Sequence, residues 1–145
     1  MSVSSAQIGS IVNDVVIKSQ HMQQVIRIAS TRAFLDTVKL DHAVWKNNVY
    51  RLLQSQSFNE TVNGHSECRL GQWYYHGDGQ SFRHLPSYSS IEAPHQQVHE
   101  SGRNAMTKAQ KGDMQQMVAS INAMELASEQ VVLQIDRLMG DIVEH

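Results

Sequence analysis

The clearest pattern along the chain is a three-to-four spacing of apolar residues in its last third. Nine positions between residues 114 and 142 follow this spacing, and eight are apolar: Met114, Met117, Ile121, Met124, Ser128, Val131, Ile135, Leu138 and Ile142. The pattern predicts an amphipathic helix of about seven turns, whose narrow stripe suits packing in a bundle or coiled coil. Gly112 and Asp113, just before it, supply a break and a candidate N-cap.

The same spacing recurs twice in the first third of the chain. It is loose over residues 8–29, where Lys18 occupies the apolar seam, and tighter over residues 35–52. We expect a break or kink near residue 30, at Ser30 or Thr31; the alternative is one long helix that runs through both segments. A further helix is expected from Pro94 to about Gln110, because proline is favoured at the first helical position.

Two polar, turn-rich segments, residues 55–66 and 76–90, are expected to be loops. Between them the short apolar block from Cys68 to Tyr75 is long enough for two helical turns. No useful strand alternation appears. The sequence therefore predicts an all-α, bundle-like fold of three or four helices, with a short helix inserted between the second and third.

Composition narrows the class of protein. The chain has 145 residues, enough for one domain, and 12 Lys and Arg against 14 Asp and Glu, for a net charge of −2. This balance argues against a nucleic-acid partner. The single cysteine rules out an internal disulfide and suits a reducing compartment. We see neither a signal peptide nor an apolar run long enough to span a membrane, and expect a cytoplasmic protein without membrane insertion.

Three histidines stand out by their positions. His42 interrupts an apolar stripe between Val38 and Trp45, and a buried imidazole must find hydrogen-bond partners or bind something. His95 and His99 are four residues apart, so they share one helix face, as paired zinc ligands on a helix do. The simpler interpretations also stand: His42 as a satisfied core histidine, and the pair as surface residues by chance.

Cys68 completes a candidate ligand set. A lone thiol usually packs in the interior, but Leu70, Gly71 and Trp73 would clamp its segment against the core and hold its side chain in place. Three imidazoles and one thiolate make a good tetrahedral zinc shell. A rival set, which we rank lower, joins Cys68 to His65 with two intervening residues, as in zinc knuckles.

With these residues in view, the sequence resembles the chemoreceptor zinc-binding domain family. Three blocks carry the resemblance: Leu40 to Lys46 around His42, the segment Cys68-Arg69-Leu70-Gly71-Gln72-Trp73, which fits a Cys-x-Leu-Gly-x-Trp signature, and His95-Gln96-Gln97-Val98-His99, which fits His-x-x-x-His. Their order and spacing agree as well. The resemblance covers roughly residues 32–142.

The resemblance implies a four-helix bundle that forms a homodimer, with one Zn²⁺ per chain held by His42, Cys68, His95 and His99. Residues 1–30 would be the end of a signalling coiled coil or an N-terminal helix, and residues 31–145 the zinc-binding bundle. It also implies a cytoplasmic regulatory role attached to a chemoreceptor or a diguanylate cyclase. The signal would be zinc, or hypochlorous acid acting on a redox-reactive Cys68. Asp41, next to His42, is a candidate for orienting the ligands.

Two other functions remain open at this point. A zinc hydrolase would need an open coordination position, whereas four protein ligands close the shell, and no acidic residue lies between His95 and His99. We therefore do not expect an enzyme. A purely structural helical module, with incidental histidines, would bind no metal.

Overall fold

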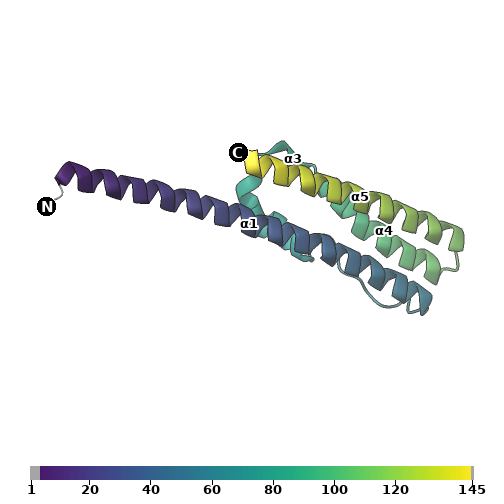
Figure 1. Cartoon of the computed structure of the whole chain (residues 1–145). Helices are drawn as coiled ribbons and strands as arrows, with labels where there is room; N and C mark the ends of the chain where they lie inside the picture. The colour runs from purple at the N-terminus through teal and green to yellow at the C-terminus, as the bar shows by residue number, and fades with distance from the viewer. Residues whose placement is uncertain (1–3, 145) are drawn as a thin grey trace. The chain divides into compact units, whose positions relative to one another are not determined.

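The computed structural model describes residues 4–144, and its regular elements are all helical (Figure 1). In chain order they are α1 (Ser5–Gln54), α2 (Arg69–His76), the 3₁₀ helix η1 (Asp78–Phe82), α3 (Pro86–Ser89), α4 (Glu92–Gln110) and α5 (Met114–Glu144). No strand occurs within residues 4–144. The prediction of an all-α helical bundle with a short inserted helix is confirmed.

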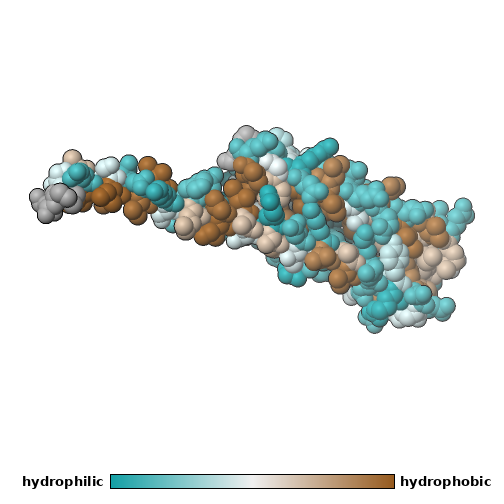
Figure 2. Space-filling view, in the orientation of Figure 1, coloured by the Kyte–Doolittle hydropathy of each residue, from teal (hydrophilic) through white to brown (hydrophobic). Residues whose placement is uncertain are grey.

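The chain divides into two compact units, residues 1–34 and residues 35–145. In the first unit, the N-terminal part of α1 carries apolar side chains on its surface, visible as brown atoms in Figure 2. The exposed apolar residues are Ile8, Ile11, Val12, Val15, Val16, Ile17, Met22, Val25 and Ile26. The proposed division at residues 30 and 31 remains a prediction, and residues 1–3 and 145 of those two segments lie outside the described part of the chain.

The expected break near residue 30 was wrong, because α1 is one helix from Ser5 to Gln54. The hydroxyl of Thr31 donates a hydrogen bond of 2.9 Å to the carbonyl of Arg27, one turn earlier. Ser and Thr side chains can satisfy themselves inside a helix in this way. With no glycine or proline between Ser10 and Gln54, nothing else in the segment interrupts the helix.

The core of the second unit lies among α4, α5 and the part of α1 that begins at Leu35. Its fully buried side chains include Leu35, Val38, Val49, Val98, Met124, Ile135 and Leu138. The apolar stripe of α5 is buried from Met124 onwards, whereas Met114 at its start is exposed. Burial of each such aliphatic side chain contributes about 1.5–3 kcal/mol, so this stripe is a main source of bundle stability.

The turn between α4 and α5 forms as the sequence predicts. Gly112 takes the left-handed conformation, with φ +77°, and the side chain of Asp113 accepts a hydrogen bond of 3.1 Å from the backbone N–H of Gln116. Helix α4 begins at Glu92, two residues before the expected start, and Pro94 lies in its first turn. The short turn makes α4 and α5 antiparallel neighbours (Figure 1).

The expected loop over residues 76–90 was wrong in part, since η1 and α3 both lie within it. Aromatic packing stabilises these short elements: the rings of Tyr74 and Tyr88 stack with centroids 4.1 Å apart, and Gln80 donates hydrogen bonds to both residues. Such contacts leave no periodic signal in a short segment. The other expected loop, residues 55–66, contains no helix.

Candidate metal centre

Three separate segments bring the four predicted ligands together. His42 projects from α1, Cys68 is the residue that precedes α2, and His95 and His99 lie one turn apart on α4. One ligand atom from each residue can be chosen so that all four lie within 4.8 Å of one another. The sulfur of Cys68 lies 3.2 Å from Nε2 of His95 and 4.0 Å from Nε2 of His42.

The four side chains are withdrawn from solvent. His42, His95 and His99 are 6%, 2% and 1% exposed, and Cys68 is half-buried. The three imidazole rings meet edge to face, with centroids 4.9–5.5 Å apart. Three buried rings in mutual contact cannot all carry a positive charge, so the arrangement favours neutral imidazoles.

The pKa shifts agree with that picture. Burial, as the largest cause, together with the nearby His42, His99 and His65 lowers the pKa of His95 to about 2. Burial also lowers the pKa of His99 to about 4, although the carbonyl of Asn63 opposes the shift. Burial lowers the pKa of His42 as well, against the raising effects of the Val38 carbonyl and Asp41. Neutral imidazole is the form that binds a metal ion.

The thiol of Cys68 sits in a mixed environment. Burial raises its pKa, and the negative charge of Asp41 acts in the same direction. Backbone groups of Gly71 and Leu70, in the first turn of α2, oppose this shift. A cation beside the sulfur would therefore be needed to hold Cys68 as a thiolate near neutral pH.

His99 provides the sharpest test of whether a metal ion fits. Its Nδ1 lies 3.0 Å from the carbonyl oxygen of Asn63, which can only accept, so Nδ1 carries the proton. The other nitrogen, Nε2, is buried and has no hydrogen-bond partner. A carbonyl that fixes the tautomer while the opposite nitrogen is left free is the usual setting of a metal-binding histidine.

The spacing of the ligand atoms also fits a small cation. Zinc bonds of about 2.0–2.3 Å in a tetrahedron place ligand atoms about 3.3–3.8 Å apart. The distances from Cys68 sulfur to the two Nε2 atoms, 3.2 and 4.0 Å, bracket this range. The residues present therefore fit a four-coordinate zinc ion after small side-chain adjustments.

Two residues behind the ligands were not foreseen as part of the site. Trp45 packs its indole on the ring of His99, with centroids 4.4 Å apart, whereas the sequence identified it only as an apolar neighbour of His42. The carbonyl of Asn63 orients His99, and no residue-type signal could have revealed it, because any residue offers a backbone carbonyl.

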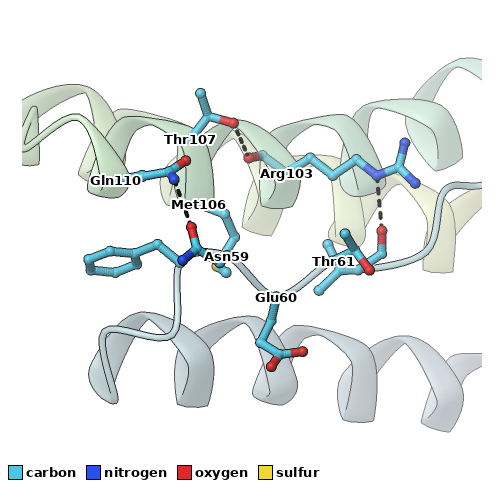
Figure 3. A pocket seen from close by; sticks show the side chains of 9 residues that line it. Asn59, Glu60, Thr61, Arg103, Met106, Thr107 and Gln110 are labelled. Atoms are coloured by element: carbon cyan, nitrogen blue, oxygen red, sulfur yellow. Dashed lines mark hydrogen bonds between the residues drawn. The ribbon is translucent and has the colours of Figure 1, made fainter.

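The segment that supplies this carbonyl is tied to α4 (Figure 3). Near the Asn63 end of the segment, Arg103 donates from Nε to the carbonyl of Val62 at 3.1 Å. Near the other end of the segment, the side chain of Asn59 accepts a hydrogen bond from Gln110 at 2.8 Å. A cavity of about 340 Å³ lies between the segment and the helix, lined by Phe58, Glu60 and Met106 among others. Arg103 also reaches Glu67, just before Cys68, at 3.2 Å.

A second cavity gives access to the site itself. It has a volume of about 330 Å³ and is lined by His42, Trp45, Cys68 and His99, among others. Asp41 lies at its wall, paired with Arg69 at 2.9 Å, and its second carboxylate oxygen is buried without a partner. Within residues 4–144, no hydrogen bond joins Asp41 to one of the three imidazoles. Asp41 acts through its negative charge, which raises the pKa of His42 and of Cys68.

Among residues 4–144, the rival ligand His65 and the other histidines are not members of the four-atom cluster. The ring of His65 approaches that of His95, with centroids 5.8 Å apart, but His65 is not a member of the cluster. His21, His76 and His84 are exposed.

A buried set of three imidazoles and one thiol, gathered by the helices of a bundle, defines a candidate zinc-binding domain. Comparison with known families agrees, because residues 42–106 match the model of the chemoreceptor zinc-binding domain. Over this stretch the chain is similar to chemoreceptor zinc-binding domains.

Comparisons with curated proteins and with solved structures found no match. None of the helices in residues 4–144 combines the length and the apolar character needed to cross a bilayer.

Proposed function

We propose that this chain is a sensory domain in which His42, Cys68, His95 and His99 hold one Zn²⁺, and in which oxidation of Cys68 is the signal. The single observation that carries the metal site is the free, buried Nε2 of His99, which points to a ligand that the protein itself does not supply. Zinc suits the donor set because three nitrogens and one sulfur match a borderline-soft cation.

A bound zinc ion would hold Cys68 as a thiolate at neutral pH. The cavity of about 330 Å³ leaves room for a small oxidant to reach this sulfur. In the reaction with hypochlorous acid, the sulfur takes the chlorine and hydroxide is released. Hydroxide then displaces chloride, so sulfur loses two electrons and the products are the sulfenic acid and chloride.

Reversal requires an outside reductant, because Cys68 is the only cysteine of the chain. One small thiol would form a mixed disulfide with the sulfenic acid and release water, and a second would restore the Cys68 thiol and leave as a disulfide. A cytoplasmic location suits this cycle, since the compartment supplies reducing thiols.

The position of Cys68 suggests how the signal leaves the site. Its carbonyl accepts the first backbone hydrogen bond of α2, from Gln72 at 2.9 Å, so movement of Cys68 moves the start of that helix. On the opposite side His42 and Trp45 belong to α1. Loss of the sulfur ligand would loosen α2 and change the packing against α1, which is a local change of the kind that biases a two-state element.

A homodimer and an attached signalling domain complete the proposal. The exposed apolar residues of the first unit, such as Ile11 and Val15, suit pairing with the same helix of a second copy. The attached output would be the signalling domain of a chemoreceptor or, as the second candidate, a diguanylate cyclase.

Metal analysis of the purified chain tests the zinc site. We expect about one zinc per chain, with zinc binding much weakened by Cys68→Ala or by His99→Ala, and unchanged in the control His84→Ala, which alters an exposed histidine. Wild-type protein that contains no zinc after growth with the metal, and that gains no stability from it, would rule out the proposal in favour of a structural module. X-ray absorption spectroscopy that shows zinc bound by three protein ligands and one water would favour a hydrolase.

Graded oxidation tests the sensing step. Hypochlorous acid is expected to modify Cys68 before the methionines, and to increase amide exchange in residues 67–75. Peptide mass spectrometry measures both. Oxidation of exposed methionines such as Met114 while Cys68 stays intact would contradict redox sensing but leave zinc binding untouched.

A further inference from the structure

The segment that carries Cys68 also carries an imidazole that the proposed zinc shell does not use. The ring of His65 lies with its centroid 5.8 Å from that of His95, at an interplanar angle of 88°. The three imidazoles of the cluster are separated by 4.9, 4.9 and 5.5 Å from one another. His65 is thus only slightly farther from His95 than the candidate ligands are from each other.

We propose that His65 is a reserve zinc ligand, whose imidazole occupies the coordination position of Cys68 when the thiolate is lost. The inference rests on the proposed function, because it assumes that zinc is held by the other three histidines. The exchange breaks one zinc–sulfur bond and forms one zinc–nitrogen bond. The neutral imidazole supplies its own lone pair, so no electron is transferred.

The backbone of His65 is already in place for this exchange. A Cβ on Gly71 would lie 1.9 Å from the carbonyl oxygen of His65 and 2.8 Å from the Cα of Ser66, so the first turn of α2 rests directly on this backbone. The same carbonyl is 3.5 Å from the sulfur of Cys68. A rotation of the His65 side chain, rather than a rearrangement of the chain, would bring the ring toward the metal position.

A contact with Tyr75 and the complete set of four ligands explain why His65 does not bind the metal while Cys68 is intact. Its ring packs edge to face on Tyr75 of α2, with centroids 6.0 Å apart. Four protein ligands already complete a tetrahedral zinc shell. His65 is half-buried, so its ring retains the freedom to turn.

Asp41 is the competing replacement, because its Oδ2 atom is buried without a partner beside Cys68. Its other oxygen is held by Arg69 at 2.9 Å, whereas no charged partner binds the ring of His65 among the resolved contacts. An imidazole is also the better match to a shell of three imidazoles. We therefore assign the reserve role to His65.

A reserve ligand changes what the sensor does after oxidation. The zinc ion stays in the domain and is held through His65, outside α2, so the loosening of α2 proposed above comes with a change of ligand and not with a loss of metal. Reduction of Cys68 then lets its sulfur return as the fourth ligand without a new supply of zinc.

A double-mutant cycle in the full chain tests the assignment. Zinc dissociation constants are measured by competition with a chromophoric chelator for wild type, His65→Ala, Cys68→Ala and the double variant. We expect His65→Ala to change the affinity less than about threefold when Cys68 is present. In the Cys68→Ala background the same substitution should weaken binding by about tenfold or more, which is a non-additive effect of the size seen for coupled ligands.

Matched variants and a second measurement decide between outcomes. Asp41→Asn in the Cys68→Ala background should weaken binding less than His65→Ala does, because it removes a nearby charge and not a ligand. X-ray absorption of Cys68→Ala should count four imidazoles. Wild-type protein treated with one equivalent of hypochlorous acid gives the same count without any substitution. The reserve role would be overturned if His65→Ala changed zinc affinity equally in both backgrounds. It would also be overturned if X-ray absorption counted only three imidazoles in Cys68→Ala, or if that variant lost its zinc completely. Failure of the wild type itself to bind zinc would instead overturn the proposed function.

Discussion

The indole of Trp45 lies on the imidazole of His99, with ring centroids 4.4 Å apart and planes tilted by 55°. The contact joins α1 to α4 directly at the candidate metal centre. Because the Nε2 of His99 is buried without a partner at the candidate metal position, a metal ion bound there would act on a ring that Trp45 touches. Trp45 is therefore a built-in reporter of the site.

Removal of zinc should change the fluorescence of Trp45. Of the two tryptophans, Trp45 lines the cavity at the candidate ligands, whereas Trp73 packs on Phe82 with centroids 6.1 Å apart. We expect chelation to change the emission of wild type and of Trp73→Phe strongly, and to change that of Trp45→Phe less, because Trp45 touches a candidate ligand directly whereas Trp73 responds only through α2. A response that persists in Trp45→Phe and disappears in Trp73→Phe would show that the metal lies elsewhere.

Gly102 determines how closely Trp45 approaches α4. A Cβ at this position would lie 2.4 Å from the Cη2 atom of the indole, so Gly102→Ala should displace Trp45 and destabilise the domain by about 1–3 kcal/mol. Zinc affinity should fall as well, because the displaced indole lies against His99. Urea unfolding and zinc competition measure the two effects.

Gly140 provides the matched control. It also lies in a helix, and a Cβ there would meet nothing within 4 Å. Gly140→Ala should raise stability by about 0.5–1 kcal/mol through helix propensity and leave zinc affinity unchanged. Equal effects of the two substitutions would show that the space around Gly102 is not limiting.

Arg103 should support zinc binding without touching the metal. It holds the carbonyl of Val62, one residue before the carbonyl that orients His99 (Figure 3). We expect Arg103→Ala to weaken zinc binding by about tenfold, a typical effect of groups that orient ligands. Gln110→Ala, which loosens the exposed end of the same segment, should have a smaller effect. The idea fails if both substitutions leave affinity unchanged.

Tyr50 should make stability depend on pH in the alkaline range. Its hydroxyl donates to Glu125 at 2.5 Å, and burial together with this carboxylate raises the pKa of Tyr50 from 10.0 to about 12. A raised pKa in the folded state means that the contribution is complete below pH 10.0 and is lost as the pH rises through about 12. Tyr50→Phe should cost about 1–2 kcal/mol near neutral pH, because a hydrogen bond to a carboxylate is lost.

The pH dependence separates this bond from simple packing. The difference in unfolding free energy between wild type and Tyr50→Phe should shrink between pH 10.0 and about 12. In this range unfolded wild type loses the Tyr50 proton while folded wild type keeps it, and Tyr50→Phe has no such proton. Other tyrosines with raised pKa values, such as Tyr74, are present in both proteins and cancel. A difference that stays constant over this range would show that the hydroxyl takes no part in stabilisation.

Periodicity was a good guide where helices are long. The stripe from Met124 to Ile142 is buried as its spacing predicts, and the turn at Gly112 and Asp113 follows from the conformations these residues favour. It was a poor guide to the interruption near Thr31, because a side-chain hydrogen bond lets a polar residue remain helical. The short elements η1 and α3 also went unpredicted, since the Tyr74–Tyr88 stack that holds them joins distant residues.

For the candidate site, sequence by itself determined the chemistry. The spacing of His95 and His99, the isolated His42 and the single Cys68 specify a nitrogen and sulfur donor set, because residue type and helical period are local properties. Only the tertiary structure decided which of these groups meet, that Asn63 fixes the proton of His99, and that His65 lies within reach of His95. Those relationships depend on backbone carbonyls and on packing between segments far apart in the chain, and neither leaves a local pattern.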